Sequence, residues 1–201
     1  MHIAVFGGAF DPPHRGHQQV ALHLLQQKLV DQVWFVPAND HPFAKNMSAQ
    51  EHRLAMLATF CTTPQLQIST WELEQPGPSY SILTLEHFAQ QHPTNTFTWV
   101  MGSDNLKQFT RWHRYSEILE RFGVLVYPRK AKFEETFDEK YLLPGMQLLA
   151  TLPVTDISST QVRELVSATL DTATQAAQLE VLVTAPIARY IQMHNLYTSQ
   201  K

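Results

Sequence analysis

The sequence predicts an α/β fold in which a parallel sheet carries helices on both of its faces. Short apolar runs alternate along the 201 residues with helix-length stretches of periodic apolar residues. A glycine turn joins the first apolar run to such a stretch, and the pattern after Arg163 is helical to the end. We therefore expect a single domain over residues 1–201, with residues 157–201 as its helical C-terminal part.

The helices are expected between the apolar runs, and the runs themselves are the expected strands. The first helix carries an apolar face over residues 20–29. Ser48 with Glu51 has the spacing of a capping box, which predicts that a second helix opens there. A third helix contains residues 84–88 and ends before Pro93. The strands are expected at residues 3–6, 32–36, 66–70, 96–101, 123–127 and 147–149.

The composition is that of an ordinary globular protein. Hydrophobic residues make up 44% of the chain and charged residues 16%, which argues against disorder. The net charge of −3 gives no sign of a nucleic-acid-binding surface, and the one cysteine, Cys61, cannot form an internal disulfide. No apolar run approaches the roughly 20 residues of a membrane span, and no secretory signal is visible. We expect a cytoplasmic protein with no membrane partner, whose oligomeric state the sequence leaves open.

Residues 7–17, GGAFDPPHRGH, are the most informative segment. Glycines let backbone N–H groups approach a phosphate, and a helix N-terminus adds unpaired donors. His14 and His17 fall on one face of the opening turn, while Asp11 is expected to tie down the turn before Pro12. The segment predicts a phosphate-handling site. The alternatives are a plain turn with two surface histidines, or a zinc pair, although no cysteine or third histidine stands at ligand spacing.

Residues 157–163, ISSTQVR, predict a second anion site. Ser158 and Gln161 have capping-box spacing, and hydroxyls, helix N–H groups and Arg163 can bind phosphate oxygens. The alternative is an ordinary capped helix with an exposed arginine. Asp104 follows another strand end, where ligands of parallel sheets bind, and its alternative role is to cap a short helix.

Several segments, in order, resemble one enzyme family. Residues 7–17 match the GGxFDPxHxGH form of the nucleotidylyltransferase superfamily with an HxGH site. Four further segments resemble the bacterial nicotinate-nucleotide adenylyltransferase branch of that superfamily. They are PSYS followed by TL (78–85), GSDNL followed by Trp112 (102–112), ISSTQVR (157–163), and YI followed by LY (190–197). The resemblance implies a Rossmann-like fold.

The implied reaction transfers the adenylyl group of ATP to nicotinate mononucleotide, giving nicotinate adenine dinucleotide and pyrophosphate in NAD biosynthesis. One alternative is a transferase of the same superfamily with another acceptor, such as nicotinamide mononucleotide or phosphopantetheine. A second alternative is a nucleotide-binding regulatory paralogue.

The resemblance also implies roles for individual residues. His14 and His17 are the catalytic residues, which contact the transferring phosphate. Gly102 and Asp104 bind ribose, and Mg²⁺ arrives with ATP, without a dedicated protein cage. The expected ATP-binding residues are Gly7, Gly8, Ala9, Phe10, Ser158, Ser159, Thr160 and Arg163. The expected mononucleotide-binding residues are Lys45, Tyr80, Ser81, Trp112 and Arg129.

The chain departs from the family pattern in four places, one of which is Val162 in place of the usual Ile. Ala9 stands where Thr or Ser is usual, and Ser81 where Thr is usual. Residues 37–45, PANDHPFAK, lack the double proline and the basic residue directly after a histidine, which leaves the choice between nicotinate and nicotinamide open. Lys45 is expected to take that basic role, and Arg129 is either a further basic contact or a solvated arginine. Trp112 is the expected stacking platform for the pyridine ring. The tryptophans expected to serve packing alone are Trp34, Trp71 and Trp99.

Overall fold

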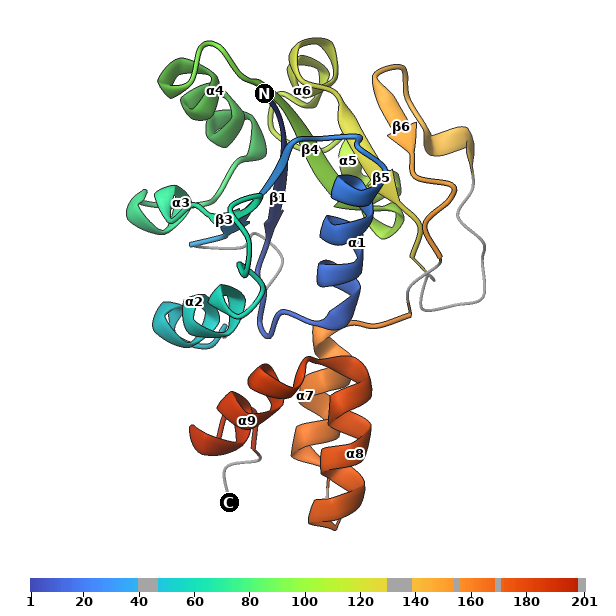
Figure 1. Ribbon diagram of the computed structural model, residues 1–201. Coiled ribbons are helices and arrows are strands. Elements are labelled where there is room, and N and C mark those ends of the chain that lie inside the picture. Colours follow the sequence, from blue (N-terminus) through green and yellow to red (C-terminus); the bar gives the residue numbers. More distant parts are fainter. Residues whose placement is uncertain (40–46, 130–138, 154–155, 169–170, 199–201) are drawn as a thin grey trace.

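A computed structural model of the protein describes residues 1–39, 47–129, 139–153, 156–168 and 171–198 (Figure 1). Its centre is a six-stranded sheet in the order β3-β2-β1-β4-β5-β6, and every pairing in it is parallel. The strands are β1 (His2–Gly8), β2 (Gln32–Pro37), β3 (Leu66–Ile68), β4 (Thr96–Gly102), β5 (Val124–Tyr127) and β6 (Met146–Leu148). The α/β fold class and all six expected strands are therefore confirmed, with small shifts at their ends.

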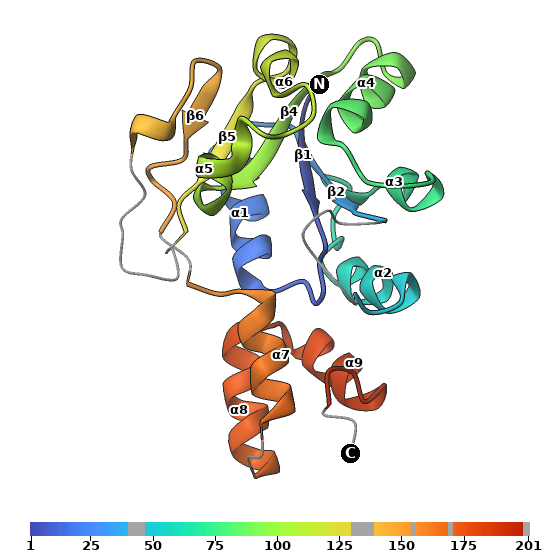
Figure 2. The ribbon, with the colours of Figure 1, turned by 180° about the vertical axis from the view of Figure 1, so that it is seen from behind.

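Helices cover both faces of the sheet because its central strand is apolar on both sides. Ala4 and Phe6 of β1 face one buried cluster, whereas Ile3 and Val5 face the other. The first face is covered by α1 (Arg15–Gln26) and α2 (Gln50–Ala58), and Figure 1 shows α1 lying across the sheet. The second face, turned forward in Figure 2, is covered by α4 (Ser81–Gln91), α5 (Leu106–Phe109) and α6 (Tyr115–Arg121), with α3 (Trp71–Glu74) near the sheet edge.

The helices expected at the C-terminal end are present. They are α7 (Ser159–Ser167), α8 (Thr172–Leu182) and α9 (Ala185–Met193). They lie beyond the carboxyl ends of the strands, with α8 against α1 and α9 against α2 (Figures 1 and 2). Their buried residues, including Val162, Leu179, Ile187 and Ile191, extend the same cluster that α1 and α2 build.

The strand order reverses between β1 and β4, which lie side by side although β2 and β3 come between them in sequence. Ligands of open parallel sheets bind at such a switch point, outside the carboxyl ends of the strands. Gly8 ends β1 and Gly102 ends β4 at this point. The fold therefore brings two of the predicted motifs to one place.

Two local predictions are wrong. Ser48 does not cap a helix, because α2 begins at Gln50 and the Ser48 N–H donates to the Asp11 carboxylate over 3.0 Å. The first helix ends at Gln26, so Leu29 packs against the core from the turn that follows rather than from a helical face.

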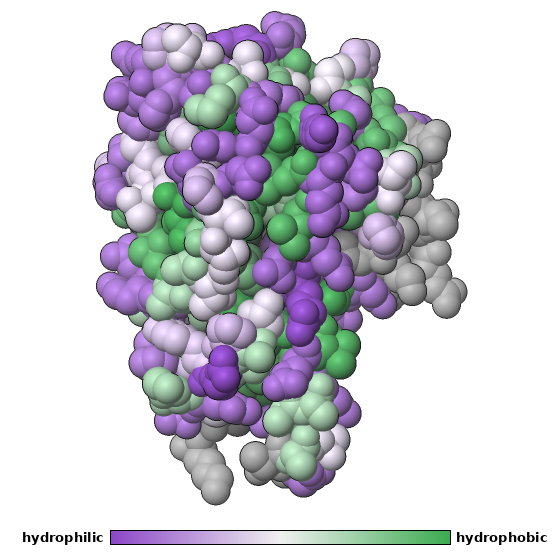
Figure 3. Space-filling model, viewed as in Figure 1, coloured by the Kyte–Doolittle hydropathy of each residue, from purple (hydrophilic) through white to green (hydrophobic). Residues whose placement is uncertain are grey.

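The surface gives few further cues. Figure 3 shows hydrophilic and hydrophobic residues interspersed over the face that α1 covers. Over the described ranges, no helix is both long and apolar enough to cross a membrane.

Candidate active site

The segment between β1 and α1 forms a tight loop whose centre is buried. Phe10 adopts a left-handed backbone (φ 48°) and is only 1% exposed. Its ring packs edge-on against Phe6, Phe35 and His17, with centroid distances of 5.8, 5.7 and 5.0 Å. This packing anchors the loop from below, because a non-glycine residue keeps positive φ only where its surroundings hold it.

His14 and His17 form a stacked pair at the start of α1. His14 is the N-cap residue, and its backbone N–H donates to His17 Nδ1 over 3.2 Å. The two rings stack with centroids 3.6 Å apart and planes inclined by 27°. The His14 side chain is buried, and its Nδ1 has no hydrogen-bond partner among the residues that the structure describes. A buried nitrogen without a partner costs free energy.

Both rings are held neutral in the free protein. Burial, with a smaller effect of the Arg129 cation in the same direction, lowers the pKa of His14 to about 3. Burial, His14 and Arg129 together hold the pKa of His17 well below its usual value. Desolvation and a neighbouring positive charge both disfavour the imidazolium form. A bound anion acts in the opposite sense, so phosphate binding at this pair favours proton uptake.

Hydrogen bonds join the start of α7 directly to the loop formed by residues 7–14. Ser158 caps the helix in the predicted capping box with Gln161. The Ser159 hydroxyl donates to the Pro12 carbonyl over 2.8 Å. Arg163 donates to the Asp11 carbonyl over 2.6 Å and to the Thr160 hydroxyl over 3.2 Å. The two segments predicted to hold phosphates are therefore in contact, although about 150 residues separate them.

Arg129 links the GSDNL segment (residues 102–106) to the ISSTQVR segment (residues 157–163). Its guanidinium pairs with the Asp104 carboxylate over 3.1 Å and donates to the Ile157 carbonyl over 3.3 Å. Its backbone N–H donates to the Ser103 hydroxyl over 2.9 Å. A Cβ at Gly102 would collide with both Asp104 and Arg129, which explains the glycine there. The alternative of a solvated arginine is wrong, because the Arg129 side chain is paired and only 21% exposed.

Among the residues predicted to bind the mononucleotide, Tyr80 contacts the sequence neighbour of Trp112. Trp112 is half-buried, with its indole edge-on to Trp99 at 6.3 Å and inclined to Phe109 at 5.1 Å. The Tyr80 ring lies 4.8 Å from the ring of His113, the neighbour of Trp112. Tyr80 is the N-cap of α4, and Ser81 is the first residue of that helix. Lys45 lies outside the described residues.

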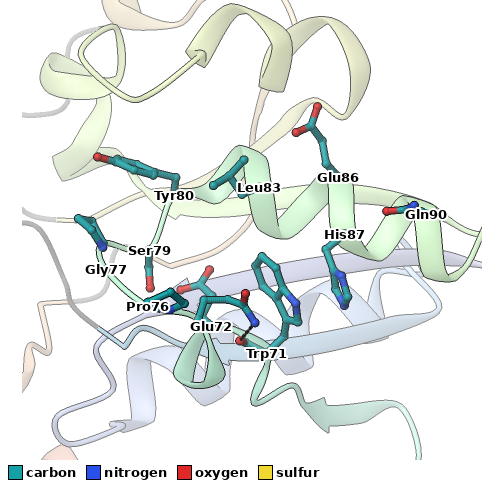
Figure 4. Close-up of a pocket in the computed structure, with 12 residues that line it drawn as sticks. Trp71, Glu72, Pro76, Gly77, Ser79, Tyr80, Leu83, Glu86, His87 and Gln90 are labelled. Carbon is teal, nitrogen blue, oxygen red and sulfur yellow. Dashed lines mark hydrogen bonds between the residues drawn. The ribbon is translucent and has the colours of Figure 1, made fainter.

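Trp71 packs against the core cluster of the second sheet face, as expected from the sequence. Its indole stacks on His87 at 4.5 Å and 14°, and both rings line a pocket of about 450 Å³ between α3 and α4 (Figure 4). Tyr80 lies at the rim of the same pocket. Glu72 lies at its base and accepts from the Thr84 hydroxyl, and burial raises the pKa of that carboxyl. No sequence motif marks the pair of Trp71 and His87, because they meet only through tertiary packing.

Comparison with known proteins agrees with this geometry. The cytidylyltransferase-like family profile matches residues 5–165. A protein of Salinibacter ruber named as a probable nicotinate-nucleotide adenylyltransferase is 35% identical over 98% of both chains. The chain belongs to the nicotinate-nucleotide adenylyltransferase family. The family resemblance that the sequence motifs indicate is thereby confirmed.

Further adenylyltransferases are similar along their whole length. The nicotinate-nucleotide adenylyltransferase of Bacillus subtilis is 28% identical over 98% of both chains. Among solved structures, the nicotinic acid mononucleotide adenylyltransferase of Plasmodium falciparum complexed with NaAD superposes with a TM-score of 0.79. It is 21% identical, and the match covers 98% of this chain and 97% of that one. The similarity to this solved structure thus agrees with the Rossmann-like sheet described above.

Proposed function

We propose that the protein transfers the adenylyl group of ATP to nicotinate mononucleotide, producing nicotinate adenine dinucleotide and pyrophosphate. The observation that carries the proposal is the meeting of the stacked His14–His17 pair with the Arg163 end of α7 at the strand ends. Full-length relatives that bear this enzyme name support the choice of acceptor.

The reaction needs positioning and charge stabilisation rather than a covalent intermediate. A phosphate oxygen of the mononucleotide attacks the α-phosphorus of ATP, a new P–O bond forms, and the bond to the β-phosphate oxygen breaks. Pyrophosphate leaves with that oxygen and its electron pair. Preorganised donors aimed at the charge that develops are the main source of rate in such reactions.

The described residues divide between these tasks. His14 and His17 donate to the α-phosphate and the leaving oxygen, taking up a proton as the anion binds. The N–H groups at the start of α7, the hydroxyls of Ser159 and Thr160, and Arg163 hold the β- and γ-phosphates. Asp104 accepts from a ribose hydroxyl. Arg129 lies beside Asp104 and the histidines, so we assign it to the phosphate side of the site, not to the pyridine side.

Trp112 and Tyr80 bind the mononucleotide from the opposite side of the β4 end. Trp112 offers a ring face for stacking, while its contacts with the rings of Trp99 and Phe109 fix its orientation. Mg²⁺ supplies charge neutralisation on the polyphosphate. It binds ATP through phosphate oxygens and keeps several waters, so it needs few protein ligands. Within the described ranges no cluster of three acidic, His or Cys side chains is available to hold it, and we assign none.

The test is pyrophosphate release from Mg-ATP, with nicotinate and nicotinamide mononucleotides compared under one set of conditions. A higher kcat/KM with nicotinate mononucleotide is expected. A higher value with the nicotinamide form would transfer the assignment to that acceptor. Release with neither compound, while ATP still binds, would refute the proposed reaction. The His17→Ala variant purified in the same way controls for contaminating activity.

A further inference from the structure

The Asp11 carboxylate is a buried anchor in the loop that leads to the histidines. Its residue is only 4% exposed, so the charge must be matched by donors. Tyr197, which lies 186 positions further along the chain, donates its hydroxyl to Asp11 Oδ1 over 2.6 Å. The Ser48 N–H donates to Oδ2 over 3.0 Å. The carboxylate thus joins the catalytic loop to the chain beyond α9 and to the segment before α2.

The backbone around Asp11 carries the groups assigned to the reaction. The Asp11 carbonyl accepts from Arg163 over 2.6 Å, and His14 follows three residues later. A rotation of Asp11 would move both the Arg163 contact and the entry into α1. Displacements of about 1 Å in a catalytic group can cost on the order of 10²-fold in rate.

A buried cation completes the charge balance of this anchor. Arg53 is 3% exposed, and it donates to the Ala9 carbonyl over 2.8 Å and to the Ser48 carbonyl over 3.2 Å. The negative charge of Asp11 favours the charged form of Arg53, against the burial that lowers its pKa. Burial and the Asp11 carboxylate raise the pKa of Tyr197, so its hydroxyl keeps the proton that it donates.

Tyr197 reaches Asp11 from a constrained backbone. Its φ is 63°, in the left-handed region that favours glycine, and Phe10 beside Asp11 has a φ of 48°. Both residues carry large side chains, so each conformation is held by its contacts. The hydrogen bond therefore connects two segments whose backbones depend on tertiary contacts.

We propose that Tyr197 is a positioning residue for adenylyl transfer. Its hydroxyl fixes the Asp11 carboxylate, and through the Asp11 backbone it keeps Arg163 and His14 in place for the transition state. This inference rests on the proposed function. Tyr197 touches none of the reacting atoms in this role, so its effect belongs to turnover and, through Arg163, to the ATP side of the site, not to the binding of the mononucleotide.

The experiment compares Tyr197→Phe with Tyr190→Phe. Both changes delete one hydroxyl near the C-terminal end, but the Tyr190 hydroxyl pairs with His52 Nδ1 over 3.1 Å instead of with Asp11. We expect Tyr197→Phe to lower kcat by about 10-fold with the KM for the mononucleotide within about twofold, because the lost contact acts on the phosphate side of the site. Tyr190→Phe is expected to leave kcat within about twofold.

Amide hydrogen exchange supplies a readout that needs no activity. Peptides covering residues 7–17 are expected to exchange faster in Tyr197→Phe and at the unaltered rate in Tyr190→Phe. If the unaltered protein released no pyrophosphate, the proposed function would fail, while the exchange comparison would still decide the role of Tyr197. Unchanged exchange and kcat in Tyr197→Phe would overturn the inference. So would an equal loss in both variants, or a Tyr197→Phe chain that does not fold, because the hydroxyl would then serve stability alone.

Discussion

The rings of His14 and His17 lie 3.6 Å apart, close enough that two imidazolium cations there would repel each other. Burial and the Arg129 cation add to that effect, so the pair is neutral in the free protein. A polyphosphate at the start of α1 would reverse the balance, because its charge favours the imidazolium form. We therefore expect ATP binding and proton uptake to be coupled at this pair.

The first prediction concerns the His17 side chain. His17→Ala is expected to lower kcat by at least about 10²-fold, the typical loss for one preorganised donor. The matched control is His23→Ala in the same helix, whose ring pairs with the Thr151 hydroxyl over 3.1 Å. Pyrophosphate release measures both variants, and circular dichroism establishes that each is folded. A near-normal rate in His17→Ala would remove this ring from the mechanism.

The second prediction concerns stability against pH. The folded pKa of His14 is about 3, below its unfolded value of 6.5, so the neutral ring belongs to the folded state. Between these two pH values the unfolded chain therefore binds more protons than the folded chain. The contribution of His14 to the free energy of unfolding is complete above about pH 6.5 and is lost progressively as the pH falls towards 3. The slope approaches about 1.4 kcal/mol per pH unit for one such group.

Urea unfolding between pH 5 and 7.5 checks this dependence. His14→Gln removes the titrating ring, so its unfolding free energy is expected to fall less steeply on acidification than that of the unaltered protein. His23→Gln serves as the control for losing a histidine from α1. Parallel curves for His14→Gln and the unaltered protein would show that His14 is charged or exposed in solution.

The sequence predicted the sheet well because its central strands, β1, β2, β4 and β5, are short runs of largely buried residues, and such runs are visible without tertiary information. It also placed residues 7–17 and residues 102–104 at one end of the sheet, since both segments follow strand ends. The contacts that join residues 7–17 to residues 157–163 were not predictable. Ser159 and Arg163 bind the carbonyls of Pro12 and Asp11, and carbonyls carry no sequence signal. Ser48 failed as a cap for a related reason, because its N–H is used by a carboxylate 37 positions away.

The third prediction tests the platform for the pyridine ring. Trp112→Ala is expected to raise the KM for the mononucleotide mainly, with a smaller change in the KM for ATP, because the stacked face is lost. Trp112→Phe retains a ring and is expected to recover part of the affinity. Trp34 is also half-buried, and its indole packs against Phe88 at 5.1 Å, so Trp34→Phe controls for loss of core packing. Unchanged mononucleotide KM in Trp112→Ala would assign Trp112 to the core.

The last prediction compares the effects of adding a side chain at Gly7 and at Gly8, the two glycines that end β1. A Cβ at Gly7 would collide with the indole of Trp99, whereas a Cβ at Gly8 would lie 3.4 Å from the Phe10 ring, at the edge of ordinary contact. Gly7→Ala is therefore expected to lower the free energy of unfolding by about 1–3 kcal/mol, the usual cost of overpacking, and Gly8→Ala by less. Denaturant unfolding of the two variants gives the comparison.

Gly7→Ala is also expected to affect the proposed mononucleotide site, through Trp99. This indole is edge-on to Trp112 at 6.3 Å, so pushing it away from Gly7 displaces the platform as well. Gly7→Ala is then expected to raise the KM for the mononucleotide, and Trp99→Phe in the same chain should restore stability by making room for the methyl group. If Gly7→Ala were as stable as Gly8→Ala, the Trp99 ring would have to move freely. The first motif would then tolerate a side chain at position 7 without consequence for Trp112.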